Sequence, residues 1–324
     1  MIVRKAGVLL ACAAALCWTI AESGAQSFPV KPVRIVVPFP AGGSFDVTAR
    51  ILAQRMQTAM GQNVIVENRP GGGTVIGTEY VARQPPDGYT MLMIGPSFTS
   101  HKALRSKLAF DTDRDFQAVS QVIGLTMGIA VNPSLPARSM KDLVALAKAR
   151  PGQVSCGTSG PGTSHHLLLE ALNLASRIDI THTPFQGAAY AVPAAVGGHI
   201  TALLLNISDM APFIKIGKLR ALVVTSKQRE ADLPDVPTAA ETGHPEIEAI
   251  NWSGFVVHSA VPAAVVTRLN QETVNALNLA DVRELLRAQT VMATPGTPAD
   301  FGALIKSDAE RYRRIIREAN VKLE

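Results

Sequence analysis

Residues 33–44 read VRIVVPFPAGGS and join three structural signals in a short stretch. The segment VRIVV at 33–37 is mostly β-branched and apolar, which is typical of a buried strand. Gly42 and Gly43 then favour a tight turn, and Ser44 is a good N-cap for apolar positions at helical spacing that end at Gly61. A strand, a glycine turn and a helix in this order predict a βα unit of a parallel sheet.

The same alternation continues outward along the chain in two series. The first series holds residues 33–94, the second starts near Gly124, and a late strand and helix could complete the first sheet. Strands are expected at 33–37, 64–66, 89–94, 129–131, 154–156, 178–183, 199–207, 219–225 and 255–257, and helices at 44–60, 74–83, 139–150, 165–176, 188–196, 265–277 and 300–320. We therefore expect two α/β units with mostly parallel sheets flanked by helices.

Composition and charge exclude several classes of protein. Hydrophobic residues make up 47% of the 324 residues and charged residues 18%, which excludes an intrinsically disordered chain. The formal charge of +5 is modest, and aromatic residues are 5%, so no nucleic-acid partner is expected. Four arginines between 311 and 317 fall in the expected last helix, where we interpret them as a solvated face.

The first 25 residues have the pattern of a secretory signal peptide. Arg4 and Lys5 precede an uncharged, largely apolar run at 6–20, and small residues follow at 23–25. The run is shorter than the roughly 20 residues of a membrane-spanning helix. We expect cleavage after Ala25 and export to an oxidising compartment. Cys12 and Cys17 would leave with the peptide, so Cys156 would remain alone and form no internal disulfide.

Two glycine-rich loops are the candidate ligand-binding segments. PFPAGGSFD at 38–46 and GTSGPGTSH at 157–165 each follow an expected strand and open an expected helix. Free N–H groups and the helix dipole make such a helix start attractive to anions. One loop on each unit would clamp an anion, although the loops alone also fit ordinary βα turns. No phosphate-binding motif is present, so nucleotide binding is not indicated.

The remaining chemistry-bearing residues do not indicate catalysis or metal binding. Cys156 near His165 and His166 suggests a cysteine nucleophile, but a lone cysteine is more often a small buried side chain. Ser159 and Ser164 lack the G-x-S-x-G context, and the seven histidines lack metal-ligand spacing. His165 could donate a hydrogen bond to a ligand or be structural. Asp46 could contact a ligand or stabilise its own helix N-terminus.

A set of ordered segments then resembles the Bug family of TctC-like, periplasmic solute-binding receptors of tripartite tricarboxylate transporters. Each segment is weakly specific, but together they cover nearly the whole expected mature chain. They are FPVKPVRIVVPFPAGGS (28–44), VENRPG (66–71), PDGYT (86–90), VNPSLP (131–136), GPGTSH (160–165), GKLRAL (217–222) and LPDVPT (233–238).

The resemblance implies a type II periplasmic-binding-protein fold, with two α/β lobes joined by two crossover strands. We expect residues 26–123 and 249–324 in one lobe and 124–248 in the other. It also implies a monomer that captures a small carboxylate and serves two integral membrane partners, without catalysis, cofactor or metal. The implied ligand-binding residues are Phe39, Gly42, Gly43, Ser44, Asp46, Ser97, Ser159, Gly162, Thr163, Ser164, His165, Gly187, Ala188 and Asn206.

Two departures from the family pattern bear on the ligand. The family often has Phe-Asp-Asn where this chain has Leu-Leu-Asn at 204–206, and often has histidine at the position of Phe98. Both changes suggest a more apolar cleft, so we expect an aromatic or aliphatic mono- or dicarboxylate rather than citrate, and an amino acid becomes less favoured. Two alternatives stay open: a secreted Ser or Cys hydrolase that uses His165, and a receptor that presents its ligand to a sensor kinase.

Overall fold

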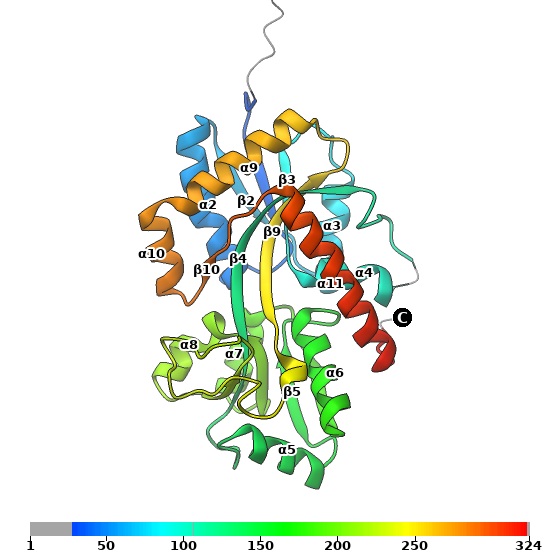
Figure 1. Ribbon diagram of the computed structural model, residues 1–324, viewed down its shortest axis with the longest axis vertical. Helices are drawn as coiled ribbons and strands as arrows, with labels where there is room; N and C mark the ends of the chain where they lie inside the picture. Colours follow the sequence, from blue (N-terminus) through cyan, green and yellow to red (C-terminus); the bar gives the residue numbers. More distant parts are fainter. Residues whose placement is uncertain (1–27, 106, 323–324) are drawn as a thin grey trace, which may run out of the picture.

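The computed structural model describes residues 28–105 and 107–322, and the expected signal peptide lies outside them. The described chain forms two sheets flanked by helices and connected by long strands (Figure 1). The strands are β1 (Val33–Val37), β2 (Val64–Asn68), β3 (Thr90–Ile94), β4 (Phe116–Val131), β5 (Val154–Thr158), β6 (Ile180–Pro184), β7 (Ala202–Asn206), β8 (Arg220–Val224), β9 (Ile250–His258) and β10 (Met292–Ala293). The helices are α2 (Ser44–Met60), α3 (Val75–Ala82), α4 (Pro96–Leu104), α5 (Met140–Ala149), α6 (Ser164–Ser176), α7 (Ala188–Val196), α8 (Ile207–Lys215), α9 (Ala263–Asn278), α10 (Ala280–Ala288) and α11 (Pro298–Glu318), with short 3-10 turns at Gly72–Thr74 and Pro245–Ile247.

The first sheet has the order β2-β1-β3-β9-β4, with β10 paired to β4. β1 runs parallel to β2 and β3, whereas β9 is antiparallel to β3 and β4. Neighbouring residues of β1 enter opposite cores: Ile35 packs in the cluster that includes Leu52 and Leu269, and Val36 in the one that includes Phe301. Burial on both faces explains why the strand sequence is almost continuously apolar. These elements form what we call the first lobe.

The second sheet continues from the end of β4 through β7, β5 and β6, and β8 pairs with β4. Its two faces are also covered, because Leu204 packs with residues of α5 and α6 while Leu205 packs with residues of α7 and α8. This sheet and α5–α8 form what we call the second lobe. The sheets are mixed: β1–β3 and β5–β7 pair in parallel, whereas β4 and β9 pair antiparallel with their neighbours. The two helix-covered sheets agree with the two-lobed α/β fold expected from the sequence.

Two strands cross between the lobes. The 16-residue strand β4 pairs with β9 from Phe116 to Thr126, and from Met127 onward it pairs with β7. β9 starts beside Thr126 and returns the chain to the first sheet. The expected lobe boundaries fall inside β4 and one residue before β9, and we retain them as a proposed division. The crossover strands place the carboxyl ends of the parallel strands of both sheets opposite each other.

Several elements differ from the sequence-based expectations. β4 begins at Phe116, whereas the sequence predicted a strand only from 129. The first part of the strand was missed because glycine, glutamine and serine interrupt its apolar pattern. The segment at 96–104 forms α4, with Pro96 at its first turn, where proline is well tolerated. α8 and α10 were also not expected. No helix within 28–105 and 107–322 has the length and apolar character that crossing a membrane requires.

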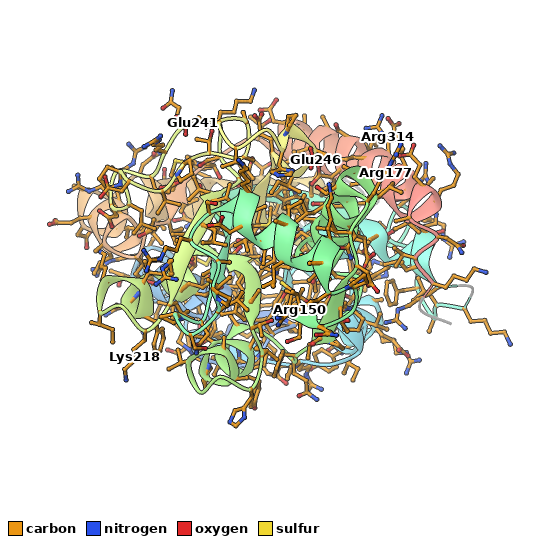
Figure 2. All side chains as sticks on the ribbon, turned by 90° about the horizontal axis from the view of Figure 1, so that it is seen from below. Arg150, Arg177, Lys218, Glu241, Glu246 and Arg314 are labelled. Carbon is orange, nitrogen blue, oxygen red and sulfur yellow. The ribbon has the colours of Figure 1, made fainter. Side chains whose placement is uncertain are left out.

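Three of the four arginines of α11 lie as expected on a solvated face, whereas Arg311 is half-buried and donates to the carbonyl of Glu248. Tyr312 and Ile316 are buried, whereas Arg313, Arg314 and Arg317 are exposed. Figure 2 shows Arg314 at the outer edge of the molecule. The helix thus packs on the protein through its apolar side.

Candidate functional site

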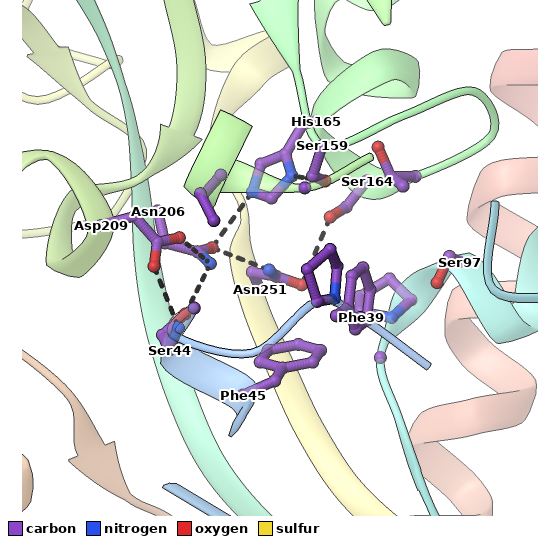
Figure 3. A pocket seen from close by; sticks show the side chains of 18 residues that line it. Phe39, Ser44, Phe45, Ser97, Ser159, Ser164, His165, Asn206, Asp209 and Asn251 are labelled. Atoms are coloured by element: carbon purple, nitrogen blue, oxygen red, sulfur yellow. Dashed lines mark hydrogen bonds between the residues drawn. The ribbon is translucent and has the colours of Figure 1, made fainter. Parts of the chain in front are cut away.

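The amino-terminal ends of five helices border one pocket between the lobes (Figure 3). The helices α2, α4, α6, α7 and α8 follow β1, β3, β5, β6 and β7, so the pocket lies at the carboxyl ends of these strands, where α/β sheets bind ligands. Each helix start carries roughly half a positive charge. No lysine or arginine of the described chain lines the pocket. The pocket therefore attracts an anion mainly through backbone N–H groups.

Asn206, at the end of β7, is the centre of the hydrogen bonds across the pocket (Figure 3). Its amide oxygen accepts from Asn251 Nδ2 at 2.8 Å and is 3.1 Å from His165 Nε2. Its amide nitrogen donates to Ser44 Oγ at 3.2 Å and to Asp209 Oδ2 at 3.0 Å. Ser44 belongs to the first lobe and Asn206 to the second, so these contacts connect the lobes.

His165 is a neutral hydrogen-bonding group in this arrangement. Burial lowers its pKa to about 4. Since Asn206 presents an oxygen to Nε2, that nitrogen carries the proton, and Nδ1 accepts from Ser159 Oγ at 2.6 Å. The imidazole is therefore held at both nitrogens, and it stays uncharged at neutral pH.

Asp209 brings an acid into the pocket wall from the first turn of α8. Its Oδ1 accepts from the backbone N–H of Ser44 at 3.1 Å, across the two lobes. Burial raises the pKa of Asp209, although these hydrogen bonds act in the opposite direction. The same residue also borders a neighbouring groove of about 600 Å³, which continues outward from the pocket past Ala188 and Ala189.

Comparison with known proteins identifies the family. The model of the tripartite tricarboxylate transporter family receptor, TctC, matches residues 48–321. The chain belongs to this family. It is 34% identical to the protein BugT of Bordetella pertussis, over 94% of either chain. A solved structure described as a periplasmic transporter is 35% identical, with a TM-score of 0.88, over 92% of this chain and all of the other.

A second solved structure, R. palustris Rpa4515 with adipate, is 29% identical with a TM-score of 0.87, over 91% of this chain and all of the other. The resemblance to the Bug family is thus confirmed, and with it the two-lobed fold of periplasmic binding proteins. This TctC-family chain is a solute-binding protein of a periplasmic family.

The structure brings most of the expected ligand-binding residues of this TctC-family chain to one pocket. Those that line it are Phe39, Gly43, Ser44, Ser97, Ser159, Thr163, Ser164, His165, Gly187, Ala188 and Asn206. Sequence reasoning missed further lining residues, namely Pro40, Phe45, Gly95, Pro96, Ala189, Asp209 and Asn251. Pro40, Phe45 and Ala189 adjoin expected residues, and Asn251 lies in a crossover strand without a motif.

Gly42, Asp46 and Gly162 lie outside the pocket wall. Asp46 accepts from the backbone N–H of Gly42 at 2.9 Å and pairs with Arg50, so it stabilises the start of α2. Gly162 accepts a hydrogen bond from Ser100 Oγ at 2.7 Å and contributes to the contact between the lobes. Asp46 and Gly162 therefore support the two loops and do not line the pocket.

The sequence-based reason for a more apolar cleft needs correction. Leu205 is buried in the core beside α7 and α8, and Phe98 packs edge-on against Phe116 with ring centroids 5.3 Å apart. Neither side chain lines the pocket. An acid does line the pocket, at Asp209 of α8. The apolar part of the wall comes instead from Phe39 and Phe45, whose ring centroids are 5.1 Å apart.

The hydrogen-bond chain from Ser159 through His165 to Asn206 superficially resembles a hydrolase triad. Burial lowers the pKa of His165 to about 4, and the hydrogen bond to the neutral amide of Asn206 raises this pKa too little to offset burial. Cys156 lies outside the pocket wall, and burial raises the pKa of its thiol to about 12. Within the described residues no cluster of side chains is suited to hold a metal ion. The low pKa of His165 and the position of Cys156 favour binding over nucleophilic attack at this site.

Proposed function

We propose that this TctC-family protein captures a small mono- or dicarboxylate between its lobes in the periplasm. It works as a monomer and delivers the ligand to two integral membrane subunits of a tripartite transporter. The observation that carries the proposal is the convergence of five helix N-termini on a pocket that no lysine or arginine of the described chain lines. Family membership and the adipate in the Rpa4515 structure support a carboxylate ligand.

The charge distribution argues against citrate as the best ligand. Each carboxylate that enters the pocket must lose water, and helix N-termini provide only partial charges in return. Asp209 adds repulsion for every further negative group. The rings of Phe39 and Phe45 offer apolar contact to an aliphatic or aromatic chain, and the groove beyond Ala188 gives room for one.

The test is a thermal-shift screen of residues 26–324 against mono-, di- and tricarboxylates, with sugars and divalent metal ions as controls. A ligand at 100 times its Kd should stabilise the protein by about 2.7 kcal/mol and raise the Tm by several degrees. We expect mono- or dicarboxylates to give the largest shifts. A response to sugars or metals with none to carboxylates would overturn the proposed function.

Two variants sharpen this screen. Ser159→Ala removes a lining hydroxyl and the hydrogen bond to His165, so it should weaken carboxylate binding. Cys156→Ala changes a buried residue outside the pocket wall and should leave the affinity unchanged. Turnover of a carboxylate ester that disappears in either variant would favour a hydrolase and contradict the proposal.

Delivery to the transporter needs a separate experiment. Cells that lack this chain should lose uptake of the radiolabelled ligand identified by the screen, and periplasmic expression of the chain should restore it. If cells without the chain take up the ligand at the same rate, the protein does not serve its transport, and ligand capture has another role.

A further inference from the structure

Asp209 presents a negative side chain to a pocket that is proposed to hold a negative ligand. Within the described residues no salt bridge includes Asp209, and its partners are neutral groups, namely the amide of Asn206 and the backbone N–H and hydroxyl of Ser44. The charged and titratable side chains nearby do not compensate it. His165 of α6 is neutral, Asp46 of α2 is engaged by Arg50, and Lys215 of α8 pairs with Asp232.

The amide and imidazole acceptors of the inner pocket are already engaged. The oxygen of Asn206 faces two donors, and that of Asn251 accepts from Ser164 Oγ and from the backbone N–H of Trp252. His165 Nδ1 accepts from Ser159. A carboxylate has about four acceptor positions, and backbone and amide N–H groups fill one on each oxygen of Asp209. The hydroxyl oxygens of the lining serines can also accept hydrogen bonds. Asp209 is the one carboxylate of the pocket wall among the described residues, and it has acceptor capacity left for a ligand.

The position of Asp209 also limits where a matching ligand group can be. Ser44 starts α2, whose free N–H groups are a proposed anchor for the ligand carboxylate, and the Ser44 N–H itself donates to Asp209. The acceptor and the carboxylate anchor are thus immediate neighbours. A ligand that meets both must carry a hydrogen-bond donor close to its carboxylate, as 2-hydroxy and 2-amino acids do.

Building on the proposed function, we propose that Asp209 determines specificity by selecting carboxylates with a hydroxyl or ammonium donor beside the carboxylate. A plain carboxylate of the same length leaves Asp209 without that donor when the lobes exclude water, and sites with unpaired polar groups discriminate strongly. The sequence-based argument against such ligands rested on Leu205, which does not line the pocket.

The opposite arrangement has Asp209 protonated and donating to a plain carboxylate. Both of its oxygens already accept from N–H groups, which favours the ionised form. The two arrangements differ in pH dependence. A protonated Asp209 would make the binding of plain carboxylates tighten as the pH falls from 7.5 to 5.5.

The decisive experiment is isothermal titration calorimetry at pH 7.5 with two matched series. Propionate, lactate and alanine share one carbon skeleton, and succinate, malate and aspartate share another. We expect the hydroxyl or ammonium member of one series to bind at least tenfold more tightly than its plain counterpart. Asp209→Asn, which is nearly isosteric, should reduce this ratio to about threefold or less, and Asp209→Ser should do the same.

Asp308→Asn is the matched control. Asp308 is another partly buried acid whose pKa burial raises, but it bonds Trp252 and lies outside the pocket wall. It should keep the wild-type ratio. Three outcomes overturn the inference but leave the proposed function intact. They are equal binding of plain and donor-bearing members, an unchanged ratio in the Asp209 variants, and tightest binding of a plain member at low pH. Binding of plain carboxylates from the thermal-shift panel, with no binding in either series, also overturns the inference alone. If no carboxylate of the panel or of the two series binds, the proposed function fails and the inference fails with it.

Discussion

At the scale of single residues, Asn206 is the side chain on which the pocket most depends. Replacement by alanine removes its bonds to His165, Asn251, Ser44 and Asp209. We expect Asn206→Ala to lower the free energy of unfolding by about 1–3 kcal/mol, because buried groups lose their partners. Its affinity for the best carboxylate should fall at least tenfold. Urea unfolding measures the change in stability, and calorimetry measures the change in affinity.

Asn132→Ala provides the control for this change. Asn132 Nδ2 donates to the carbonyl of Ala195 at 2.7 Å in the second lobe, outside the pocket wall. Its replacement should cost stability but no affinity. Unaltered ligand binding by Asn206→Ala would show that Asn206 does not organise the site.

Three histidines give the stability a defined pH dependence. Burial lowers the pKa of His101 and His165 to about 4 and that of His182 to about 3, whereas an unfolded histidine titrates near pH 6.5. Between about pH 6.5 and 4 the unfolded chain binds more protons than the folded chain, so the free energy of unfolding falls as the pH falls. Asp209 and Asp308 oppose this trend, because the folded state raises their pKa values and takes up their protons first.

Urea unfolding at pH 7.5, 5.5 and 4.5 measures this dependence. His101→Gln lies outside the pocket wall and should flatten the curve by removing one of the three contributions. A curve of His101→Gln with the same slope as the wild-type curve would mean that His101 titrates alike in the folded and unfolded chain.

At the scale of elements, the sequence predicted the helices and strands with clear periodicity and missed those without it. α2 and α9 show apolar positions at regular helical spacing and lie close to their expected bounds. α8 begins directly after β7, so its apolar start reads as a continuation of the strand. Because Asp209 depends on α8 for its position, missing this helix also hid the acid in the pocket wall.

The packing of α6 against α4 and α11 joins the lobes through apolar contacts. Leu167 of α6 lies in a cluster with Leu104, Tyr312 and Ile316 of the first lobe. Leu172, also in α6, is buried wholly within the second lobe. Either residue changed to alanine should lower the free energy of unfolding by about 2–5 kcal/mol. Only Leu167→Ala should also weaken ligand binding, because it removes a contact that holds the lobes together.

Urea unfolding and calorimetry on both variants separate these effects. An equal loss of affinity in the two would indicate that α6 affects the site only through the stability of its own lobe.

At the scale of the whole molecule, Gly73 marks a place where the backbones of the two lobes lie close together. Its φ is +62°, and an added Cβ would lie 2.5 Å from the carbonyl oxygen of Pro161 in the other lobe. Gly61 has a φ of +63° and open space around it. Alanine at either position should cost about 1 kcal/mol in backbone strain. Only Gly73→Ala should obstruct the approach of the lobes, which lowers affinity.

Small-angle scattering with saturating ligand checks this expectation. Gly73→Ala should have a larger radius of gyration than Gly61→Ala. If the two variants have equal radii of gyration and equal affinities, the backbone at Pro161 can shift to accommodate the added methyl group and the expectation is wrong.

The arrangement of the site could be predicted from the sequence only in part. The loops at 38–46 and 157–165 reveal their role through glycine, serine and their place after strands. Asn251 and Asp209 have no such local signal, because they reach the pocket through the crossover strand β9 and through α8. Whether Ser44 finds a partner on the opposite lobe depends on contacts between residues far apart in the sequence.

The two lobes also differ in how the chain assembles them. The second lobe lies between β4 and β9 and uses nearby segments, such as β5 with β6. In the first lobe, by contrast, Leu92 of β3 pairs with Val256 of β9. Pairing between distant segments slows folding, because a long loop must close first. The second lobe should therefore form early and the first lobe late, so binding competence is the last property that the folding chain acquires.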